Sequence, residues 1–226
     1  MKQGGSDAAK RAAGESAAEA VEDGMVVGLG TGSTAAHAIR AIGRAVDAGL
    51  DVVGVPTSFQ SRELARDCGI PLADLDDVSV DLAIDGADEV AGGDLIKGGG
   101  AAHAREKVVD ASADRFLVVA DPTKEAEVLA HPVPVEVLPM ARSTVAAAVE
   151  DLGGDPQLRR AERKDGPVVT DNGNLVLDCD FGAIEGPAGL AGDLAGVPGV
   201  VEHGLFVDMA DEIHVGSPDG VAVRTP

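Results

Sequence analysis

The sequence predicts an α/β fold: an open, mostly parallel, Rossmann-like sheet with helices on both faces, plus a smaller ferredoxin-like α+β domain. In the first 120 residues, short apolar runs alternate with segments of helical periodicity, a pattern typical of parallel sheets covered on both faces. After about residue 131 the order becomes strand, helix, two strands, helix and strand, which is the ferredoxin-like order. The chain has 226 residues, 45% of them hydrophobic, which suits one large domain with a smaller partner.

The larger domain is expected over residues 1–130 and about 208–226. Its helices are expected at 6–22, 33–47, 58–68 and 101–111, and its strands at 25–29, 51–55, 80–84 and 116–120. Gly24 can end the first helix, Thr31 or Ser33 is the expected cap of the second, and Ser58 opens the third. A last strand at 212–216 is expected to return to the large sheet.

The smaller domain is expected over about 131–207. A strand-like segment at 134–139, in a stretch punctuated by Pro132, Pro134 and Pro139, and a helix at about 142–152 open it. Asn172-Gly173 is a strong hairpin signal, so strands are expected at 167–170 and 174–178. A helix at about 187–196 and a strand at about 200–207 complete the domain, which is a candidate oligomer interface.

Charge, aromatic content and hydropathy exclude a nucleic-acid-binding protein, a disordered chain and a membrane protein. The formal net charge is −21, and the chain has four Phe and no Trp or Tyr, so it lacks the cations and aromatics with which proteins bind nucleic acids. The mean hydropathy of +0.10 excludes a disordered chain, so the acids must coat a packed body. This balance is typical of cytoplasmic proteins from salt-loving organisms. Without an apolar signal segment or a run of 18 apolar residues, we expect a cytoplasmic protein with no membrane contact.

The first candidate site is a glycine-rich turn between a predicted strand and a predicted helix. It consists of Gly28-Leu29-Gly30 followed by Thr31, Gly32, Ser33 and Thr34. Glycine amides, a helix start and three hydroxyls favour a phosphate. A dinucleotide fingerprint fails, because Ser33 replaces its third glycine and the next strand does not end in an acid; a P-loop fails for want of Gly-Lys-Ser/Thr. A monophosphate loop, or a turn without a ligand, remains.

The second candidate site is Asp85-Gly86-Ala87-Asp88-Glu89, directly after a predicted strand. The carboxyl ends of parallel strands line the ligand crevice of open α/β sheets. These acids could act in acid–base chemistry, bind a metal or face solvent. Solvent is the expected environment of Glu89, and no further ligand at suitable spacing supports a metal.

The third candidate site is Lys97-Gly98-Gly99-Gly100 and the helix after it. Residues 97–124 carry five cations and four acids, a locally positive segment in an acidic chain that could attract an anionic substrate. Glu106 shares its helix face with the apolar Ala102 and Val109, so it could be a partly desolvated general base; a surface ion pair is the alternative. For His103, packing or solvent exposure is expected rather than catalysis.

Together these motifs resemble the ribose-5-phosphate isomerases of the A type. The matching segments are GLGTGSTAAHAI (28–39), PTSFQSRELA (56–65), DLAIDGADEV (81–90), DLIKGGGAAHAREKVV (94–109), PVPVEVLPMAR (132–142), VTDNGNLVLD (169–178) and VPGVVEHGLF (197–206). They follow the family's order over nearly the whole chain, and the combination of DGADE, KGGG and REK is highly specific. Where members often have two residues such as Leu-Leu or Leu-Thr, this chain has His103-Ala104.

The resemblance implies interconversion of D-ribose 5-phosphate and D-ribulose 5-phosphate through an enediolate, with no metal and no organic cofactor. It implies Glu106 as the base, with Asp85, Asp88 and Lys97 as the other catalytic residues. The implied substrate-binding residues are Thr31, Gly32, Ser33, Thr34, Asp85, Gly86, Ala87, Asp88, Lys97, Gly98, Gly99, Gly100 and Lys124. A homodimer or homotetramer is also implied. A non-catalytic sugar-phosphate-binding module and a related enzyme of amino-sugar phosphates or CoA thioesters are the alternatives.

Overall fold

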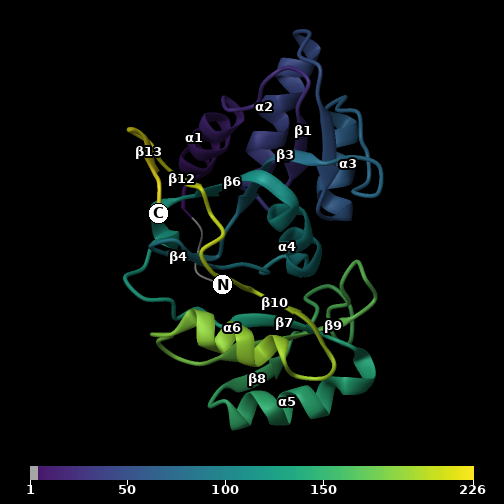
Figure 1. Cartoon of the computed structure of the whole chain (residues 1–226), viewed down its shortest axis with the longest axis vertical. Helices are drawn as coiled ribbons and strands as arrows, with labels where there is room; N and C mark the ends of the chain where they lie inside the picture. The colour runs from purple at the N-terminus through teal and green to yellow at the C-terminus, as the bar shows by residue number, and fades with distance from the viewer. Residues whose placement is uncertain (1–4) are drawn as a thin grey trace. The chain divides into compact units, whose positions relative to one another are not determined.

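The computed structural model describes residues 5–226 and divides into two units (Figure 1). Unit 1 comprises the chain up to Ala87, Arg105–Glu125 and Asp208–Pro226; unit 2 comprises Asp88–Ala104 and Ala126–Val207. The sequence placed the boundary near residue 131, whereas residues 88–104 and 126–130 group with unit 2. The reason is a short hairpin at 89–96 that pairs with β11 (Leu205–Phe206) of unit 2.

Unit 1 contains a six-stranded sheet in the order β13-β12-β6-β3-β1-β2. Its strands are β1 (Val26–Leu29), β2 (Val53–Pro56), β3 (Val80–Gly86), β6 (Ala113–Ala120), β12 (Glu212–Ser217) and β13 (Gly220–Arg224). All neighbouring pairs are parallel except β12 with β13. The mostly parallel sheet and the return of the last predicted strand, β12, are therefore confirmed; β13 is an additional antiparallel edge strand.

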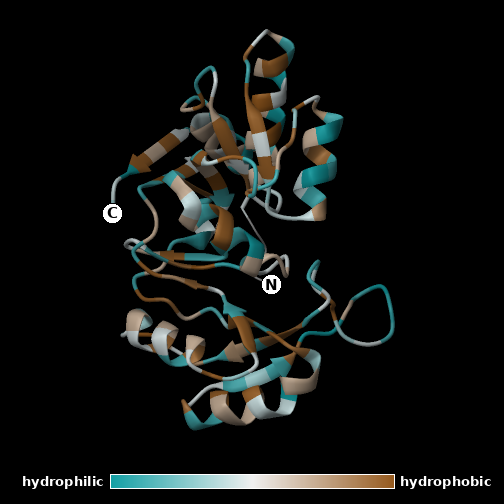
Figure 2. Cartoon of the chain, turned by 45° about the vertical axis from the view of Figure 1, so that its right-hand side comes forward, coloured by the Kyte–Doolittle hydropathy of each residue, from teal (hydrophilic) through white to brown (hydrophobic). Residues whose placement is uncertain are grey.

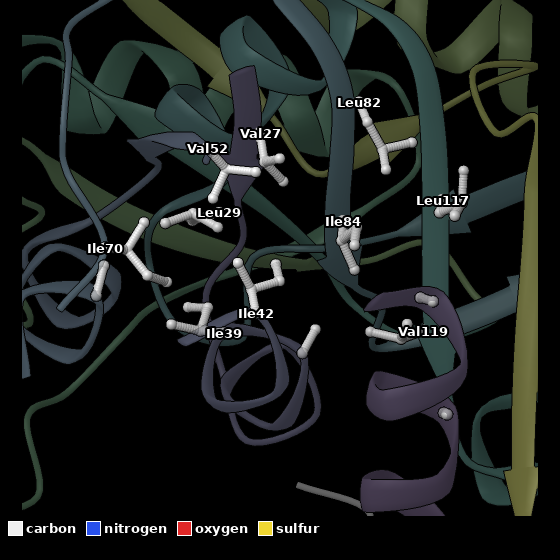
Figure 3. Close-up of a cluster of buried hydrophobic side chains, with 14 residues drawn as sticks. Val27, Leu29, Ile39, Ile42, Val52, Ile70, Leu82, Ile84, Leu117 and Val119 are labelled. Atoms are coloured by element: carbon white, nitrogen blue, oxygen red, sulfur yellow. The ribbon is translucent and has the colours of Figure 1, made fainter. Parts of the chain in front are cut away.

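Helices cover both faces of this sheet. They are α1 (Asp7–Ala18), α2 (Ala35–Asp47), α3 (Phe59–Asp67) and α4 (His103–Ser112, whose first two residues group with unit 2), with the short 3₁₀ helix η1 (Pro122–Lys124) after β6. On one face, Ile39 and Ile42 of α2 pack with Val27, Ile84 and other strand residues in the cluster drawn in Figure 3. On the other face, Val109 of α4 packs against strand residues Val55 and Val80.

Unit 2 has a four-stranded antiparallel sheet in the order β10-β7-β9-β8. Its elements follow one another as β7 (Val133–Val137), η2 (Pro139–Ala141), α5 (Arg142–Asp151), β8 (Asp155–Leu158), β9 (Leu175–Asp180), α6 (Pro187–Ala195) and β10 (Val200–His203). This is the ferredoxin-like order that the sequence predicts. A second sheet joins β4 (Glu89–Ala91), β5 (Asp94–Ile96) and β11. Several strands are coloured mainly as hydrophobic, whereas the helices alternate between hydrophobic and hydrophilic residues (Figure 2).

The predicted strand at 167–170 is not formed. Residues 167 and 169 make only isolated bridges, and β9 pairs instead with β8. Asn172-Gly173 does form a turn, in which Thr170 N–H donates to the Asn174 carbonyl oxygen at 2.9 Å. The Thr170 hydroxyl and both Asn side chains donate to the buried carboxylate of Glu136 in β7, at 2.8–3.1 Å. These side-chain bonds fold the segment over the sheet, so it does not pair along a ladder.

His214 in β12 gives unit 1 a predictable response to pH. Its Nδ1 lies 3.0 Å from the Ser16 hydroxyl of α1, and burial is the main cause that lowers the pKa of His214, although Glu212 acts in the opposite direction. The unfolded chain then binds a proton more readily than the folded chain. We expect the free energy of unfolding to fall as the pH drops below about 6.5, the ordinary pKa of histidine. Denaturant unfolding at constant salt measures this, and His214→Asn should flatten the slope; parallel curves for the two proteins would contradict the assignment.

Candidate active site

The glycine-rich turn after β1 is held by its hydroxyl groups. Gly30 N–H donates to the Ile84 carbonyl oxygen at 3.0 Å, which ties the turn to β3. The Thr31 hydroxyl lies 2.8 Å from the hydroxyl of Thr57 and 2.7 Å from that of Ser58, both of which follow β2. Gly32 has φ of +105°, a conformation that favours glycine. The turn is thus fixed to two neighbouring strands before any ligand binds.

The start of α2 has no side-chain cap. Thr34 is the N-cap residue and its side chain makes no capping hydrogen bond, so the expected cap at Thr31 or Ser33 is wrong. Thr31 cannot serve because its hydroxyl is engaged with Thr57 and Ser58, and Ser33 is exposed. The amides of the first helical turn therefore receive no side-chain cap. Such amides, together with the helix dipole, favour an anion such as phosphate.

Asp85 lies near the end of β3 and is fully buried. Its Oδ1 accepts from Thr31 N–H at 3.0 Å and from Gly86 N–H at 2.6 Å. A Cβ on Gly30 would lie 2.2 Å from the same oxygen, so the approach of β1 to Asp85 requires glycine at position 30. Backbone amides therefore orient the carboxylate, and one of them, Thr31 N–H, belongs to the glycine-rich turn after β1.

Lys124 ends η1, the turn that follows β6, and is half-buried. In the sheet, β6, β3 and β1 are neighbours; Asp85 lies at the carboxyl end of β3, and Lys124 and Thr31 follow the carboxyl ends of β6 and β1. That edge is the ligand-binding edge of open α/β sheets. Unit 1 thus places the hydroxyl turn, the aspartate and a cation at one edge of its sheet.

Glu106 lies in the first turn of α4 and is only 3% exposed. The alternative of a Glu106 side chain at the protein surface is therefore wrong. Its neighbour Arg105 does not extend freely into solvent either: its guanidinium lies 5.2 Å from the ring centre of Phe59 at the start of α3. A buried carboxylate at a helix N-terminus is sheltered from water, which suits a group that takes a proton from carbon.

Asp88 and Glu89 belong to unit 2. Asp88 Oδ2 accepts from Gly99 N–H at 2.6 Å, so the second and third sequence motifs meet there. Glu89 is 2% exposed, and its Oε2 accepts from the amides of Ala130 and His131 at 2.5 and 2.7 Å. The expectation of a solvated Glu89 is therefore wrong. Its buried carboxylate accepts hydrogen bonds from two backbone amides in the segment before β7.

Lys97 is 2% exposed, and its Nζ lies 5.3 Å from the ring centre of Phe206. Its backbone N–H donates to the Gly204 carbonyl oxygen at 2.8 Å, which anchors the segment at β11. Gly98 is buried with φ of +109°, whereas Gly99 and Gly100 are exposed. Unit 2 thus presents a buried cation followed by two accessible glycines.

Two residues near the glycines have contacts that the sequence does not predict. His103 is fully buried, and its Nε2 accepts from Glu136 N–H at 3.1 Å beside an irregularity in the pairing of β7 with β10. Arg159 donates to the carbonyl oxygens of Gly98 and Gly99 at 2.8 and 3.2 Å. Its only sequence signal is that four of residues 159–164 are Arg or Lys. The contact joins residues about 60 positions apart, so no local spacing predicts it.

Within residues 5–226, no three His, Cys, Asp or Glu side chains form a group that could hold a metal ion. Over the same residues, none of the helices combines the length and apolar character needed to cross a bilayer.

Comparison with known proteins gives a consistent family. The family model described as ribose 5-phosphate isomerase A (phosphoriboisomerase A) matches residues 53–220. The chain is 88% identical over 225 residues to the ribose-5-phosphate isomerase A of Haloarcula marismortui, covering 100% of this chain and 99% of the relative. It is 69% identical to that of Halorubrum lacusprofundi, covering 97% of both chains. These halophilic relatives fit the acidic, salt-adapted character expected from the charge.

Solved structures agree in fold. The ribose 5-phosphate isomerase A of Methanocaldococcus jannaschii has a TM-score of 0.92 and 44% identity, covering 96% of this chain and 98% of its own. A D-ribose-5-phosphate isomerase solved in complex with phospho-erythronic acid has a TM-score of 0.93 and 42% identity, covering 96% and 97%. Both likenesses extend over nearly the full length of each chain.

Proposed function

The chain belongs to the ribose 5-phosphate isomerase A family and interconverts D-ribose 5-phosphate and D-ribulose 5-phosphate; from this premise we propose how its residues carry the reaction. The observation that carries the proposal is the burial of Glu106 in the first turn of α4. An aldose–ketose isomerase moves a proton between C2 and C1, and this requires a positioned base sheltered from water. Glu106 is that base in our proposal.

The phosphate is assigned to the turn of Thr31, Gly32, Ser33 and Thr34, with Lys124 as the nearby cation. The uncapped start of α2 and the half-buried lysine after the neighbouring β6 support this assignment. The relative that binds phospho-erythronic acid supports an organic phosphate as the class of ligand.

Asp85 is assigned to acid–base help in opening the furanose ring, with Gly86 and Ala87 completing its segment. The two amides on Oδ1 hold this carboxylate in one orientation while it transfers a proton. Asp88 is assigned to orienting substrate hydroxyls, and its bond to Gly99 N–H supports this role because it fixes the side chain.

Lys97 and the Gly98, Gly99 and Gly100 segment, whose Gly99 N–H already donates to Asp88, are assigned to the oxyanion that develops in the enediolate. Removal of the C2 proton places negative charge on oxygen, and a preorganised cation or amide stabilises that charge as it forms. The burial of Lys97 supports the assignment, because electrostatic stabilisation is stronger away from water.

The residues assigned to base and phosphate lie in unit 1, and those assigned to the oxyanion lie in unit 2. The chain passes between the two units at residues 87–88, 104–105, 125–126 and 207–208. A homodimer or homotetramer formed through unit 2, and a cytoplasmic location, are further proposals; the exposed apolar residues Leu138, Met140 and Val201 of unit 2 support the former.

A comparison of three substrates tests the assigned activity. We expect conversion of ribose 5-phosphate, and none of glucosamine 6-phosphate or an acyl-CoA, in coupled assays at molar KCl. Turnover restricted to either of the other two substrates would overturn the proposed chemistry, and phosphate binding without turnover of any would indicate a non-catalytic module.

Replacement of Lys97 separates its role from that of Lys124. Lys97→Met keeps most of the buried volume, and we expect kcat to fall by about 10²–10³, as for loss of one oxyanion donor. Inhibition by inorganic phosphate should stay unchanged in this variant and weaken in Lys124→Ala. Steady-state kinetics with phosphate as inhibitor measures both. An unchanged kcat with weakened phosphate binding in Lys97→Met would move Lys97 to the phosphate.

A further inference from the structure

We propose that Arg159 is a positioning residue for the isomerisation, which fixes the Gly98–Gly100 segment so that the Gly100 amide donates to the oxyanion. This inference rests on the proposed function, because it concerns the oxyanion assigned there. Arg159 follows β8 of unit 2 and lies far from the glycines in sequence. Its side chain is 15% exposed, so the guanidinium is largely withdrawn from water.

The guanidinium fixes two consecutive peptide groups. Nη1 of Arg159 donates to the carbonyl oxygen of Gly98 at 2.8 Å and to that of Gly99 at 3.2 Å. On the opposite side of the first peptide, Gly99 N–H donates to Asp88 Oδ2 at 2.6 Å. The peptide between Gly98 and Gly99 is thus held at both its oxygen and its hydrogen. Glycine has the greatest backbone freedom, so three glycines in a row need such outside contacts to keep one conformation.

The second peptide is held at its oxygen alone. No peptide bond among the described residues is cis, so the carbonyl of Gly99 and the N–H of Gly100 point in opposite directions. With the carbonyl facing Arg159, the Gly100 N–H is directed away from the guanidinium. Gly100 is exposed, and its N–H donates to none of residues 5–226. The segment therefore presents one oriented amide donor that a ligand oxygen can use.

The charge on Arg159 also strengthens this donor. A cation bonded to a carbonyl oxygen polarises the peptide, and hydrogen bonds in a chain reinforce one another. Asp178 in β9 holds the guanidinium in place: Nε donates to Asp178 Oδ2 at 2.9 Å, and Nη2 pairs with Oδ1. This two-point pair occupies the other side of the guanidinium and leaves Nη1 for the glycines. A lysine cannot reproduce that geometry, because it has a single charged nitrogen.

Kinetics of Arg159→Met test the inference. We expect kcat to fall by about 10- to 100-fold, below the roughly 10²–10³-fold effect of deleting a donor, because the amide is displaced rather than removed. KM for ribose 5-phosphate should change by less than about 3-fold, since the contact acts on the developing oxyanion. Phospho-erythronic acid, whose planar carboxylate resembles an enediolate, should inhibit more weakly by the same factor as kcat/KM, while inhibition by inorganic phosphate stays constant.

Four further variants distinguish positioning from charge and from general stability. Arg159→Lys should remain nearly as slow as Arg159→Met. Asp178→Asn should also lower kcat. The double variant Arg159→Met/Asp178→Asn should be no slower than Arg159→Met, because both substitutions act through the same contact between Arg159 and the glycine segment. Arg160→Met removes the same charge one residue away, at an exposed side chain, and should retain wild-type kinetics.

The outcomes separate the inference from the function on which it rests. A wild-type protein that does not isomerise ribose 5-phosphate would refute the proposed function. A wild-type kcat in folded Arg159→Met, or full activity in Arg159→Lys, would overturn the positioning role alone. If Arg159→Met does not fold, Asp178→Asn decides: a lowered kcat with unchanged phosphate inhibition supports the inference, and a lowered melting temperature with unchanged kcat refutes it.

Discussion

Glu106→Gln should lower kcat by about 10²–10⁴ while KM for ribose 5-phosphate stays within a few-fold of the wild-type value. The amide has nearly the same shape as the carboxylate, so the first turn of α4 should keep its packing around this 3%-exposed side chain. The amide cannot accept a proton from carbon, so the chemical step loses its base. A coupled assay of both reaction directions measures the effect.

A matched control and an exchange experiment sharpen this result. Glu63 in α3 is exposed, so Glu63→Gln makes the same chemical change in another helix of unit 1 and should leave kcat unchanged. With substrate deuterated at C2, loss of the label to solvent should slow in Glu106→Gln as much as isomerisation does, because one base performs both. Wild-type exchange combined with slow isomerisation would assign Glu106 to a step other than proton abstraction.

Gly30→Ala should damage activity and stability together. A Cβ at this position would lie 2.2 Å from Asp85 Oδ1 and 2.6 Å from Asp85 Cα. Rotation of the aspartate cannot relieve contact with its own backbone, so β1 and β3 must separate where Gly30 N–H bonds Ile84. We expect a stability loss of about 1–3 kcal/mol, as for overpacking of a core. Misplacement of the phosphate turn and Asp85 should lower kcat/KM by about 100-fold.

The control for this change is a glycine with open space around it. Gly189 lies in α6, and a Cβ there would meet no atom within 4 Å. Gly189→Ala should keep wild-type kinetics and gain helix stability, since alanine favours helices over glycine. Thermal unfolding and steady-state kinetics of both variants give the comparison. Wild-type kcat/KM in Gly30→Ala would show that Asp85 and the turn move independently.

The sequence predicts those features that depend on local signals. Ser58 caps α3 in a reciprocal pair with Ser61, because a hydroxyl before a helix satisfies its free amides. Apolar runs predict β1, β3 and β6, because strands buried on both faces have no polar alternation. The three motifs likewise lie within short segments, so their residue types alone indicate their chemistry.

Sequence patterns do not predict features that depend on contacts between residues far apart in the chain. β8 contains Asp155 and Pro156, which disfavour strands, and it forms because β9 offers it an edge. Glu89 looks like a solvated acid in the sequence, because the amides of residues 130–131 that bind it come close only in the folded chain. Arg159 reaches the glycine segment only through the folded sheet of unit 2, so no spacing in the sequence reveals this contact.

The interrupted path of the chain through unit 1 sets the order in which the protein can fold during synthesis. β6 pairs with β12, yet β12 lies in the final segment 208–226, after all of unit 2. Because domains fold as units while the ribosome adds residues, unit 2 can complete its antiparallel sheet first, while β6 still has an open edge. β12 emerges only after unit 2 and then closes that edge. A message truncated near residue 207 would therefore yield a chain whose smaller unit is folded and whose larger unit exposes an aggregation-prone strand.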